Sequence, residues 1–408
     1  MTSEAPNHAL SGIRVVDLTT VVFGPSATQV LADYGADVIK VEAVEGDSTR
    51  FTGPTREAGM SSLFLGSNRN KRSVVLDLKT EAGRGALLAL VDTADIFVHN
   101  IRPQKLKALG ISRSQLCGRN PRLIYLALLG FGEDGPYAGR PAYDDIIQSL
   151  AGAADLGRLQ GGTPRYMPTI AADKVAGQMA AHAVLAALFQ RERTGRGQYV
   201  EVPMFECFVH FLMIEHLNAR RLVGPDASAA PQEGEFGYLR SFAEWRRPYP
   251  TRDGFVCFMP YSDQNWRDFF EAVGLAEWGE DPRFATITAR TENIEALYRM
   301  LEMVIAKETT AHWLALGDRL GIACAPVNGM SDLEADPHLA AVGMFDTMEA
   351  GPDWSMRFVR NPVRLSDSTV EPRMPPRLGE HTAEVLRELK LPAAPVERTV
   401  KSRLAVDG

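Results

Sequence analysis

Several features that would assign a chain to a particular class of protein are scarce here. The chain has only four cysteines, and their wide spacing fits neither a disulfide framework nor a zinc knuckle. We expect the thiols of Cys117, Cys207, Cys257 and Cys324 to be reduced and mostly buried. No other cluster of metal-ligand residues stands out, so we predict no metal site.

Runs of basic residues and long hydrophobic segments are scarce as well. With a formal net charge of −7 and no basic amphipathic helix, the chain lacks an electrostatic surface for nucleic acid or for a membrane. Polar residues such as Gln178, His182, His210 and Glu215 interrupt the longest apolar stretches. The opening residues, MTSEAPNHALSG, contain no apolar export segment. We therefore expect a soluble, cytoplasmic protein without nucleic-acid or membrane partners.

The common nucleotide-binding motifs are also missing. The loop Thr19–Pro25, after the first expected strand, lacks the three-glycine dinucleotide fingerprint, and no later strand-to-helix turn supplies it. No Gly-Lys-Ser or Gly-Lys-Thr sequence occurs. These absences disfavour nicotinamide enzymes and P-loop nucleotidases.

The first 130 residues do contain a regular alternation of strands and helices. Helical stretches separate the expected strands, which cover Ile13–Leu18, Ala36–Glu42, Ser73–Leu78, Asp95–Asn100 and Leu123–Phe131. This pattern predicts an α/β fold with a parallel sheet and helices on both faces. Ligands of such sheets bind beyond the carboxyl ends of the strands.

A compositional break follows later in the chain. The 408 residues exceed what one hydrophobic core usually fills, so two domains are expected. The stretch LVGPDASAAPQEGEFG, rich in Pro, Ala, Gly and Ser, is a candidate boundary. Short strands and helices after it predict a smaller α+β unit.

Asp173 lies near the start of an alanine-rich helix that Gly195 ends. A carboxylate there most often caps the free N–H groups of the first turn. On residue type alone, capping is favoured over a reactive role.

Basic residues gather at 68–72 and 102–107, where they could hold phosphates or simply form solvated patches. A Gly- and Pro-rich loop, GFGEDGPYAGRPAYDD, closes with Tyr143, Asp144 and Asp145, and we expect one of the two aspartates only to cap a helix.

Several short motifs occur together along nearly the whole chain. They include GADVIKVE, NRNKRSVVLDLK, RPAYD, AADKVAG, APV and LGEHTAEVLREL, together with Asn-x-Arg-Pro at 100–103 and Arg-Thr-Gly-Arg-Gly-Gln at 193–198. In this order and spacing, the chain resembles CoA-transferase family III, which includes formyl-CoA and carnitine CoA-transferases and the α-methylacyl-CoA racemases.

The resemblance implies an overall architecture. A large Rossmann-like domain built from both chain ends would comprise 1–224 and 327–408, and a smaller α+β domain, 225–326, would be inserted between them. Two chains would thread through each other like linked rings, giving an interlocked homodimer.

The resemblance also implies covalent catalysis by Asp173. In the transferases, the matching aspartate attacks the thioester of an acyl-CoA donor and forms a mixed anhydride, which the CoA thiolate converts to an aspartyl-CoA thioester. A carboxylic acid acceptor then takes over the CoA. The CoA thioester is a substrate, and no permanently bound cofactor is implied. Helix N–H groups beside Asp173 are expected to favour its ionised form.

Other residues match positions that contact CoA in the family. They are Val22 and Phe23, the run from Leu76 to Lys79, and Asn100, Ile101 and Arg102. Ala43 replaces a basic residue of the family, so Arg72, Lys79, Arg102 or Lys105 must supply the phosphate contacts. Tyr143 and Asp144 match the tyrosine and acid beside the thioester, whereas Met167 and Pro168 are predicted to be packing residues.

Alternatives remain open at this point. A racemase would use a histidine as one of its two bases, and Tyr143 occupies that position, where a neutral phenol is a poor base. A CoA-binding protein without catalysis and a dinucleotide enzyme with a divergent motif are lesser alternatives. Gly234–Gly237 lacks the family's glycine-rich lid, which disfavours formate, and Arg240, Arg246 and Arg247 could favour dicarboxylates or be surface residues.

Overall fold

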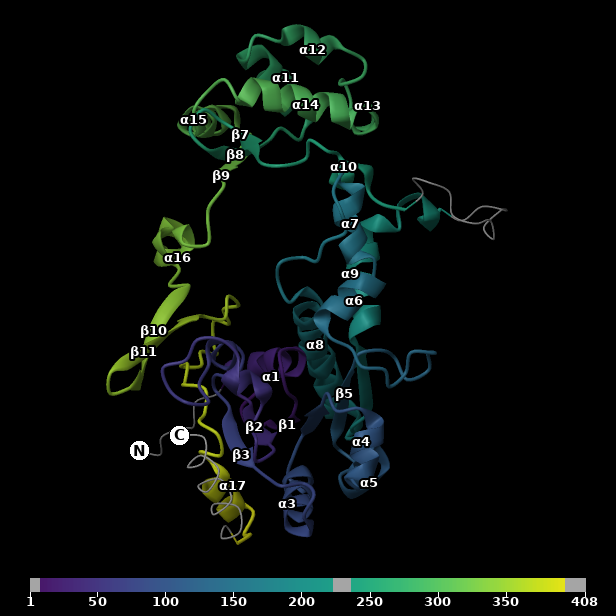
Figure 1. The fold of residues 1–408 in the computed structure, drawn as a ribbon, viewed down its shortest axis with the longest axis vertical. Coiled ribbons are helices and arrows are strands. Elements are labelled where there is room, and N and C mark those ends of the chain that lie inside the picture. The colour runs from purple at the N-terminus through teal and green to yellow at the C-terminus, as the bar shows by residue number, and fades with distance from the viewer. Residues whose placement is uncertain (1–7, 223–235, 393–408) are drawn as a thin grey trace. The chain divides into compact units, whose positions relative to one another are not determined.

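The computed structural model describes residues 8–222 and 236–392, and Figure 1 shows the chain as a ribbon. The chain forms two compact units. The first comprises Met1–Ala151, Tyr166–Phe211 and Ala341–Gly408, and the second comprises Gly152–Arg165 and Leu212–Ala340. The expected boundary at 224/225 lies outside the described residues, and the division into domains at 224/225 and 326/327 stays a prediction.

The first unit is organised around a six-stranded sheet in the order β3-β2-β1-β4-β5-β6. All neighbouring strands in it are parallel. Its strands are β1 (Arg14–Leu18), β2 (Asp37–Glu42), β3 (Arg72–Val75), β4 (Ile96–His99), β5 (Ile124–Leu129) and β6 (Tyr199–Pro203). The expected α/β fold with a parallel sheet is confirmed. The strand order reverses between β1 and β4, which is where open parallel sheets form their ligand crevice.

Helices cover this sheet on both faces. On one face, α1 and α8 lie side by side (Figure 1). On the other, apolar residues of α3, α5 and α17 share one buried cluster with Val16, Ile39, Val74 and Phe97 of the strands. The helices with residues in this unit are α1 (Phe23–Asp33), α2 (Ser62–Leu65), α3 (Glu81–Asp92), α4 (Pro103–Ala108), α5 (Arg113–Arg119), α6 (Asp144–Leu150), α8 (Ala171–Thr194), α9 (Met204–His216), α16 (Pro337–Ala341) and α17 (Thr382–Glu388).

Late segments of the chain return to the first unit. The antiparallel hairpin β10 (Phe345–Gly351) and β11 (Trp354–Val359) belongs to it. The segment before α17 then reaches β3, where the His381 N–H donates to the Ser73 carbonyl at 2.9 Å and the Thr382 hydroxyl accepts from the Val75 N–H at 3.1 Å.

The second unit has a small antiparallel sheet and an aromatic core. The sheet order is β7-β8-β9, and Trp266, Phe269, Phe284 and Trp313 lie in the core. Its elements are α7 (Ala153–Leu159), α10 (Leu239–Phe242), β7 (Tyr249–Pro250), β8 (Phe255–Met259), α11 (Asp263–Ala272), α12 (Ala276–Glu280), α13 (Ile287–Glu292), α14 (Ile294–Ile305), α15 (Thr310–Leu320) and β9 (Ala323–Pro326). This mixture of helices and strands matches the α+β composition expected after the break.

Two further features bear on the sequence-based expectations. All four cysteines are free, but Cys257 is exposed and the other three are only half-buried, so the expectation that they are mostly buried is wrong. Of these, Cys117 and Cys324 pack against the edges of the two hydrophobic cores. Within the described residues, no helix combines the length and apolar character needed to cross a bilayer.

Candidate active site

Asp173 is the third residue of α8 and is buried, with only 6% of its surface exposed. Its Oδ1 accepts a hydrogen bond from the Phe23 N–H at 3.0 Å. Phe23 is the first residue of α1, and an N–H at that position has no acceptor within its own helix. The starts of two helices therefore meet at this carboxylate.

Small residues let these two helix starts approach. A Cβ on Gly177, one turn after Asp173, would lie 2.5 Å from the Ser26 Oγ and 3.0 Å from the Phe23 carbonyl oxygen. Ala172, Ala176 and Ala180 are also fully buried on α8. The alanine-rich sequence thus has a packing role besides its helix propensity, because it brings Asp173 within reach of Phe23.

The capping role expected for this helix start belongs to Asp144, not to Asp173. The Asp144 Oδ1 accepts from the Ala172 N–H of α8 at 2.7 Å, and its Oδ2 accepts from the Gln148 side chain at 2.6 Å. Asp144 itself is the first residue of α6. One aspartate of the Gly- and Pro-rich loop therefore caps a helix, as expected, but that helix is α8 and not its own.

Burial raises the pKa of Asp173 to about 6, and the negative charge of Asp144 acts in the same direction. The Phe23 N–H opposes both effects without outweighing them. The helix N–H groups thus favour the ionised form, as expected, but removal of the charge from water and the Asp144 carboxylate outweigh them, so the net shift of the pKa is upward. Above pH 6 the carboxylate is nonetheless ionised and poorly solvated.

Asp173 opens onto a cavity of about 340 Å³ in the first unit. Seven predicted site residues line this cavity: Phe23, Asn100, Ile101, Arg102, Lys105, Tyr143 and Asp173. The remaining lining residues are Thr20, Val21, Leu128, Gly130, Arg140, Pro141, Ala142 and Met204. Most of the lining residues come just after the last residue of β1, β4, β5 or β6. The cavity therefore lies at the carboxyl edge of the sheet, as expected.

Besides Asp144, which caps α8, four other predicted residues are not among those lining the cavity. Val22, the residue before α1, is buried, and Leu76 lies in the hydrophobic cluster that packs on the sheet. Lys79 follows β3 and is exposed. Arg72 is the first residue of β3, at the opposite sheet edge, where it pairs with Asp37, Glu384 and Glu388.

The basic cluster at 68–72 is built into the fold. Arg69 pairs with Asp33, and Lys71 pairs with Asp17 at 3.3 Å, all four side chains being largely buried. Neither sequence-based interpretation of this cluster, phosphate binding or a solvated patch, holds for these two residues. Their partners lie more than thirty positions away in sequence, so local pattern gave no signal of the pairing.

The turn between β1 and α1 forms one wall of the cavity. The side chain of Asn100 makes two hydrogen bonds to this turn: it accepts from the Thr20 N–H at 3.1 Å and donates to the Thr20 carbonyl at 2.8 Å. Val21 adopts a left-handed backbone conformation, with φ of 70°. Such a conformation is rare for a β-branched residue and persists only where neighbouring contacts impose it.

Known proteins identify the family. The model of CoA-transferase family III matches residues 10–382. The chain belongs to CoA-transferase family III. Succinate–glutarate CoA-transferase of Agrobacterium fabrum is 32% identical over 407 residues, which cover 97% of this chain and 99% of that protein. Formyl-CoA:oxalate CoA-transferase of Streptomyces avermitilis is 34% identical over 393 residues, covering 92% and 94%.

The fold of this family III CoA-transferase is shared with a solved relative. The crystal structure of Rv3272 from M. tuberculosis superimposes with a TM-score of 0.79 at 31% identity, covering 94% of this chain and all of that one. The protein is thus an enzyme of a family whose substrates are CoA thioesters.

Of the eight lining residues that were not predicted, Arg140 is the one with a charged side chain. Arg140 lines the cavity, and its guanidinium carbon lies 4.5 Å from the centre of the Tyr137 ring. Arg140 is the first residue of the RPAYD motif, so its position in the Gly- and Pro-rich loop was the available signal. With Arg102 and Lys105 it makes three cations that line the same cavity as the Asp173 carboxylate.

Metal chemistry has no candidate ligand set in the part of the chain that the structure describes. Groups of three or more His, Cys, Asp or Glu side chains that could hold an ion are not found there.

Proposed function

We propose that this enzyme transfers CoA from an acyl-CoA thioester to a carboxylic acid, with Asp173 as the nucleophile. The observation that supports this most strongly is a buried carboxylate with a pKa of about 6 that opens onto a cavity lined by three cations. A carboxylate deprived of water is a better nucleophile than a solvated one, and at neutral pH it is still ionised.

The chemistry requires no proton transfer. A carboxylate oxygen of Asp173 attacks the thioester carbonyl carbon, the C–S bond breaks, and the CoA thiolate leaves behind a mixed anhydride. The thiolate then attacks the aspartyl carbonyl, which releases the donor carboxylate and forms an aspartyl-CoA thioester. The acceptor carboxylate displaces the thiolate to form a second anhydride. Thiolate attack on the acceptor's carbonyl yields the new acyl-CoA and restores Asp173.

Different residues of the cavity suit different parts of the CoA molecule. Arg102 and Lys105 belong to the start of α4, and Arg140 belongs to the loop before α6. Unlike Arg72, these three cations have no carboxylate partner among the described residues. We assign the negatively charged phosphates of CoA to this group, and Asn100, Ile101 and Phe23 to the pantetheine arm. Val22, Leu76 and Lys79 remain predicted contacts of CoA.

Racemisation is the alternative. It needs a second base opposite Asp173, and the cavity presents the exposed phenol of Tyr143 there and no histidine among its described lining residues. Incubation of a chiral 2-methylacyl-CoA in deuterated water separates the two reactions. Deuterium incorporation at the α-carbon without any acceptor acid would favour the racemase.

Trapping the intermediate tests the transferase directly. Wild-type enzyme incubated with an acyl-CoA and then hydroxylamine should acquire a hydroxamate on Asp173, detected by peptide mass spectrometry. The variant Asp173→Ala should acquire none and should move no CoA between carboxylates. Activity retained by that variant would refute covalent catalysis. A panel of acyl-CoA donors and carboxylic acid acceptors, read by mass spectrometry, would then identify the substrates.

The dicarboxylate substrates of one relative do not yet point to a recognition residue here. Arg247 pairs with Glu302 at 2.9 Å, Arg246 donates to the Ser241 hydroxyl, and Arg240 donates to the Tyr298 hydroxyl. All three arginines lie in the second unit. The homodimer and the cytoplasmic location expected from the sequence remain part of this proposal.

A further inference from the structure

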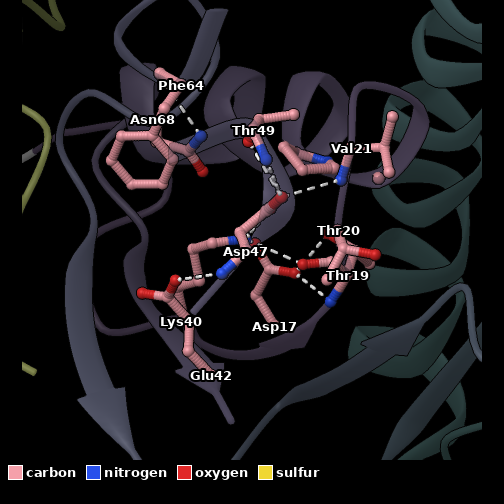
Figure 2. A network of polar contacts seen from close by, with 12 residues as sticks. Asp17, Thr19, Thr20, Val21, Lys40, Glu42, Asp47, Thr49, Phe64 and Asn68 are labelled. Atoms are coloured by element: carbon pink, nitrogen blue, oxygen red, sulfur yellow. Dashed lines mark hydrogen bonds and ion pairs between the residues drawn. The ribbon is translucent and has the colours of Figure 1, made fainter. Parts of the chain in front are cut away.

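The turn that carries Phe23 is held by buried charges beneath it. Asp17 accepts from the Thr19 N–H at 2.9 Å, and the Lys40 ammonium donates to the Thr19 carbonyl at 2.8 Å. Asp47 accepts from the Val21 N–H at 3.3 Å. Figure 2 shows Asp47 joined by dashed lines to Val21 and Thr49. The backbone is therefore held from Thr19 to the N–H of the left-handed residue Val21.

Lys40 and Asp47 form an ion pair of 2.9 Å, and both side chains are completely buried. Asp47 also accepts from the Thr49 N–H at 3.0 Å and from its hydroxyl at 2.8 Å. Although burial acts against the charge, the carboxylates of Asp47, Asp17 and Glu42 raise the pKa of Lys40 above its usual range. The pair is thus ionised across the working pH range of the enzyme.

The backbone of residues 19–23 and the hydrogen bonds at its two ends connect the Lys40–Asp47 pair to the carboxylate of Asp173. Lys40 holds the carbonyl of Thr19, Asp47 holds the N–H of Val21, and two residues later the Phe23 N–H reaches Asp173 at 3.0 Å. A valine at φ of 70° is in a strained backbone conformation that persists only where neighbouring contacts impose it. Without the pair, relaxation of that strain would turn the Phe23 N–H away from Asp173.

We propose that the Lys40–Asp47 ion pair is a positioning pair that holds residues 19–23 in the conformation in which the Phe23 N–H meets Asp173. This inference rests on the proposed function, because it matters to catalysis only if Asp173 is the nucleophile. The competing interpretation is that the pair stabilises the fold and has no influence on the site.

A second buried ion pair provides the matched control. Arg50 pairs with Glu42 at 2.7 Å, and both side chains are as deeply buried as the first pair. The Arg50 guanidinium also donates to the carbonyls of Gly59 and Pro376, and no hydrogen bond from it reaches residues 19–23 among the described contacts. Removing Arg50 therefore breaks a comparable pair whose link to the turn is only indirect: Glu42 accepts from the Asp47 N–H at 3.0 Å, but neither Arg50 nor Glu42 has a hydrogen bond to residues 19–23 among the described contacts.

The experiment compares Lys40→Met with Arg50→Met. Both should lower the melting temperature. Only Lys40→Met should slow formation of the enzyme–CoA adduct in single turnovers, by about tenfold or more. In the pH profile of kcat/KM, the acid limb is where activity falls as Asp173 becomes protonated. In Lys40→Met this limb should move to higher pH by about half a unit or more, because Asp173 loses its N–H donor.

The acid limb reports the protonation of Asp173, and several other charged or titratable groups face that residue. Asp144 faces it from α6, Arg102 and Lys105 from α4, and Arg140 and Tyr143 from the loop before α6. Lys174 is tied to the Thr169 hydroxyl at 2.6 Å. None of these groups is altered in either variant, so a shift confined to Lys40→Met identifies the turn as its cause.

If Lys40→Met does not fold, Asp47→Asn keeps the shape of the side chain while removing the ion pair, and it should move the adduct rate and the acid limb in the same directions. Identical rates and pH profiles for the turn variants and Arg50→Met would overturn the inference. The Asp173→Ala variant keeps the two proposals distinguishable. If it transfers CoA, the proposed function fails; if it is inactive while the turn variants behave like Arg50→Met, only the positioning role fails.

Discussion

At the scale of single residues, the site depends on charges kept out of water. Asp173 opens onto the cavity yet is nearly buried, and its charge is compensated by one N–H from Phe23 rather than by a paired cation. Such a residue is expected to weaken the fold while enabling the chemistry, the usual conflict between stability and activity at a reactive centre.

Replacing Asp173 by asparagine should therefore stabilise the protein at neutral pH. A pKa of about 6, in place of an ordinary carboxyl value of about 4, corresponds to at most roughly 3 kcal/mol. Between these values the folded state binds more protons than the unfolded state, so wild-type stability falls as pH rises from about 4 to about 6. Asp173→Asn lacks this slope. Urea denaturation at a series of pH values measures the difference.

The stability gap between variant and wild type should be small at pH 4, widen up to about pH 6 and stay constant above it. Asp173→Asn keeps an acceptor for the Phe23 N–H, so the comparison isolates the charge. A variant less stable than wild type at pH 7 would show that the carboxylate is better solvated than its burial indicates.

Val21 offers a second test at residue scale. Glycine accepts a φ of 70° without the penalty that a β-branched side chain incurs, although it costs more entropy on folding. The two effects should nearly cancel, so Val21→Gly should change the free energy of unfolding by less than about 1 kcal/mol. Val22→Gly is the matched control, since Val22 has a φ of −120° and is buried.

The control should lose about 2 kcal/mol or more, from lost burial and added chain entropy. Denaturant midpoints at constant m-value measure both variants. Equal losses at the two positions would mean that Val21 is not strained.

At the scale of elements, the site is a junction of three helix starts. The first residue of α6 caps α8, the first N–H of α1 binds a carboxylate of α8, and Gly177 permits the close contact between α1 and α8. Asp144 therefore has two effects on Asp173. It fixes the helix that carries Asp173, the proposed nucleophile, and its charge raises the pKa of Asp173.

The variant Asp144→Asn separates these effects. An asparagine oxygen can still accept from the Ala172 N–H, so the cap remains while the negative charge is lost. The pKa of Asp173 should fall, and the acid limb of kcat/KM should move to lower pH. Asp145→Asn, on the exposed neighbour in the same helix, should leave the limb unchanged. A limb that does not move in Asp144→Asn would assign the raised pKa to burial alone.

Helix and strand positions were largely predictable because each reflects local pattern. Thr80 caps α3 by accepting from the Gly83 N–H, and Gly195 ends α8 in a left-handed conformation, as expected. The expected strand at Ser73–Leu78 stops earlier, at Val75. Boundaries were thus the weaker part of the prediction.

The site was predictable only in part. The cavity at the carboxyl edge follows from the topology of parallel sheets, but the importance of Asp173 came from family resemblance, since helix physics alone favoured a cap. The buried pair Lys40–Asp47 left no trace in the sequence, because a lysine within an apolar strand reveals no partner. The raised pKa of Asp173 likewise depends on burial, which only tertiary packing creates.

At the scale of the whole molecule, exposed apolar residues bear on the expected homodimer. Tyr143, Ile146 and Leu150 are spaced to share one face along α6, from its N-cap to its last residue, and are each about half exposed or more. Apolar groups in such a row usually mark a contact with another chain.

An interlocked dimer makes a sharper prediction than dimerisation alone. Linked rings separate only if one of them opens, so dilution should not dissociate the dimer while the chains stay folded. Light scattering should give about 89 kDa, twice the 44.7 kDa of one chain, from micromolar concentration down to the detection limit. A dimer joined only through surfaces obeys mass action and would yield a 44.7 kDa species on dilution, with the melting temperature falling in parallel. Folded monomer at any concentration would therefore exclude an interlocked dimer. A mass that stays constant on dilution and falls only when the chains unfold would support it.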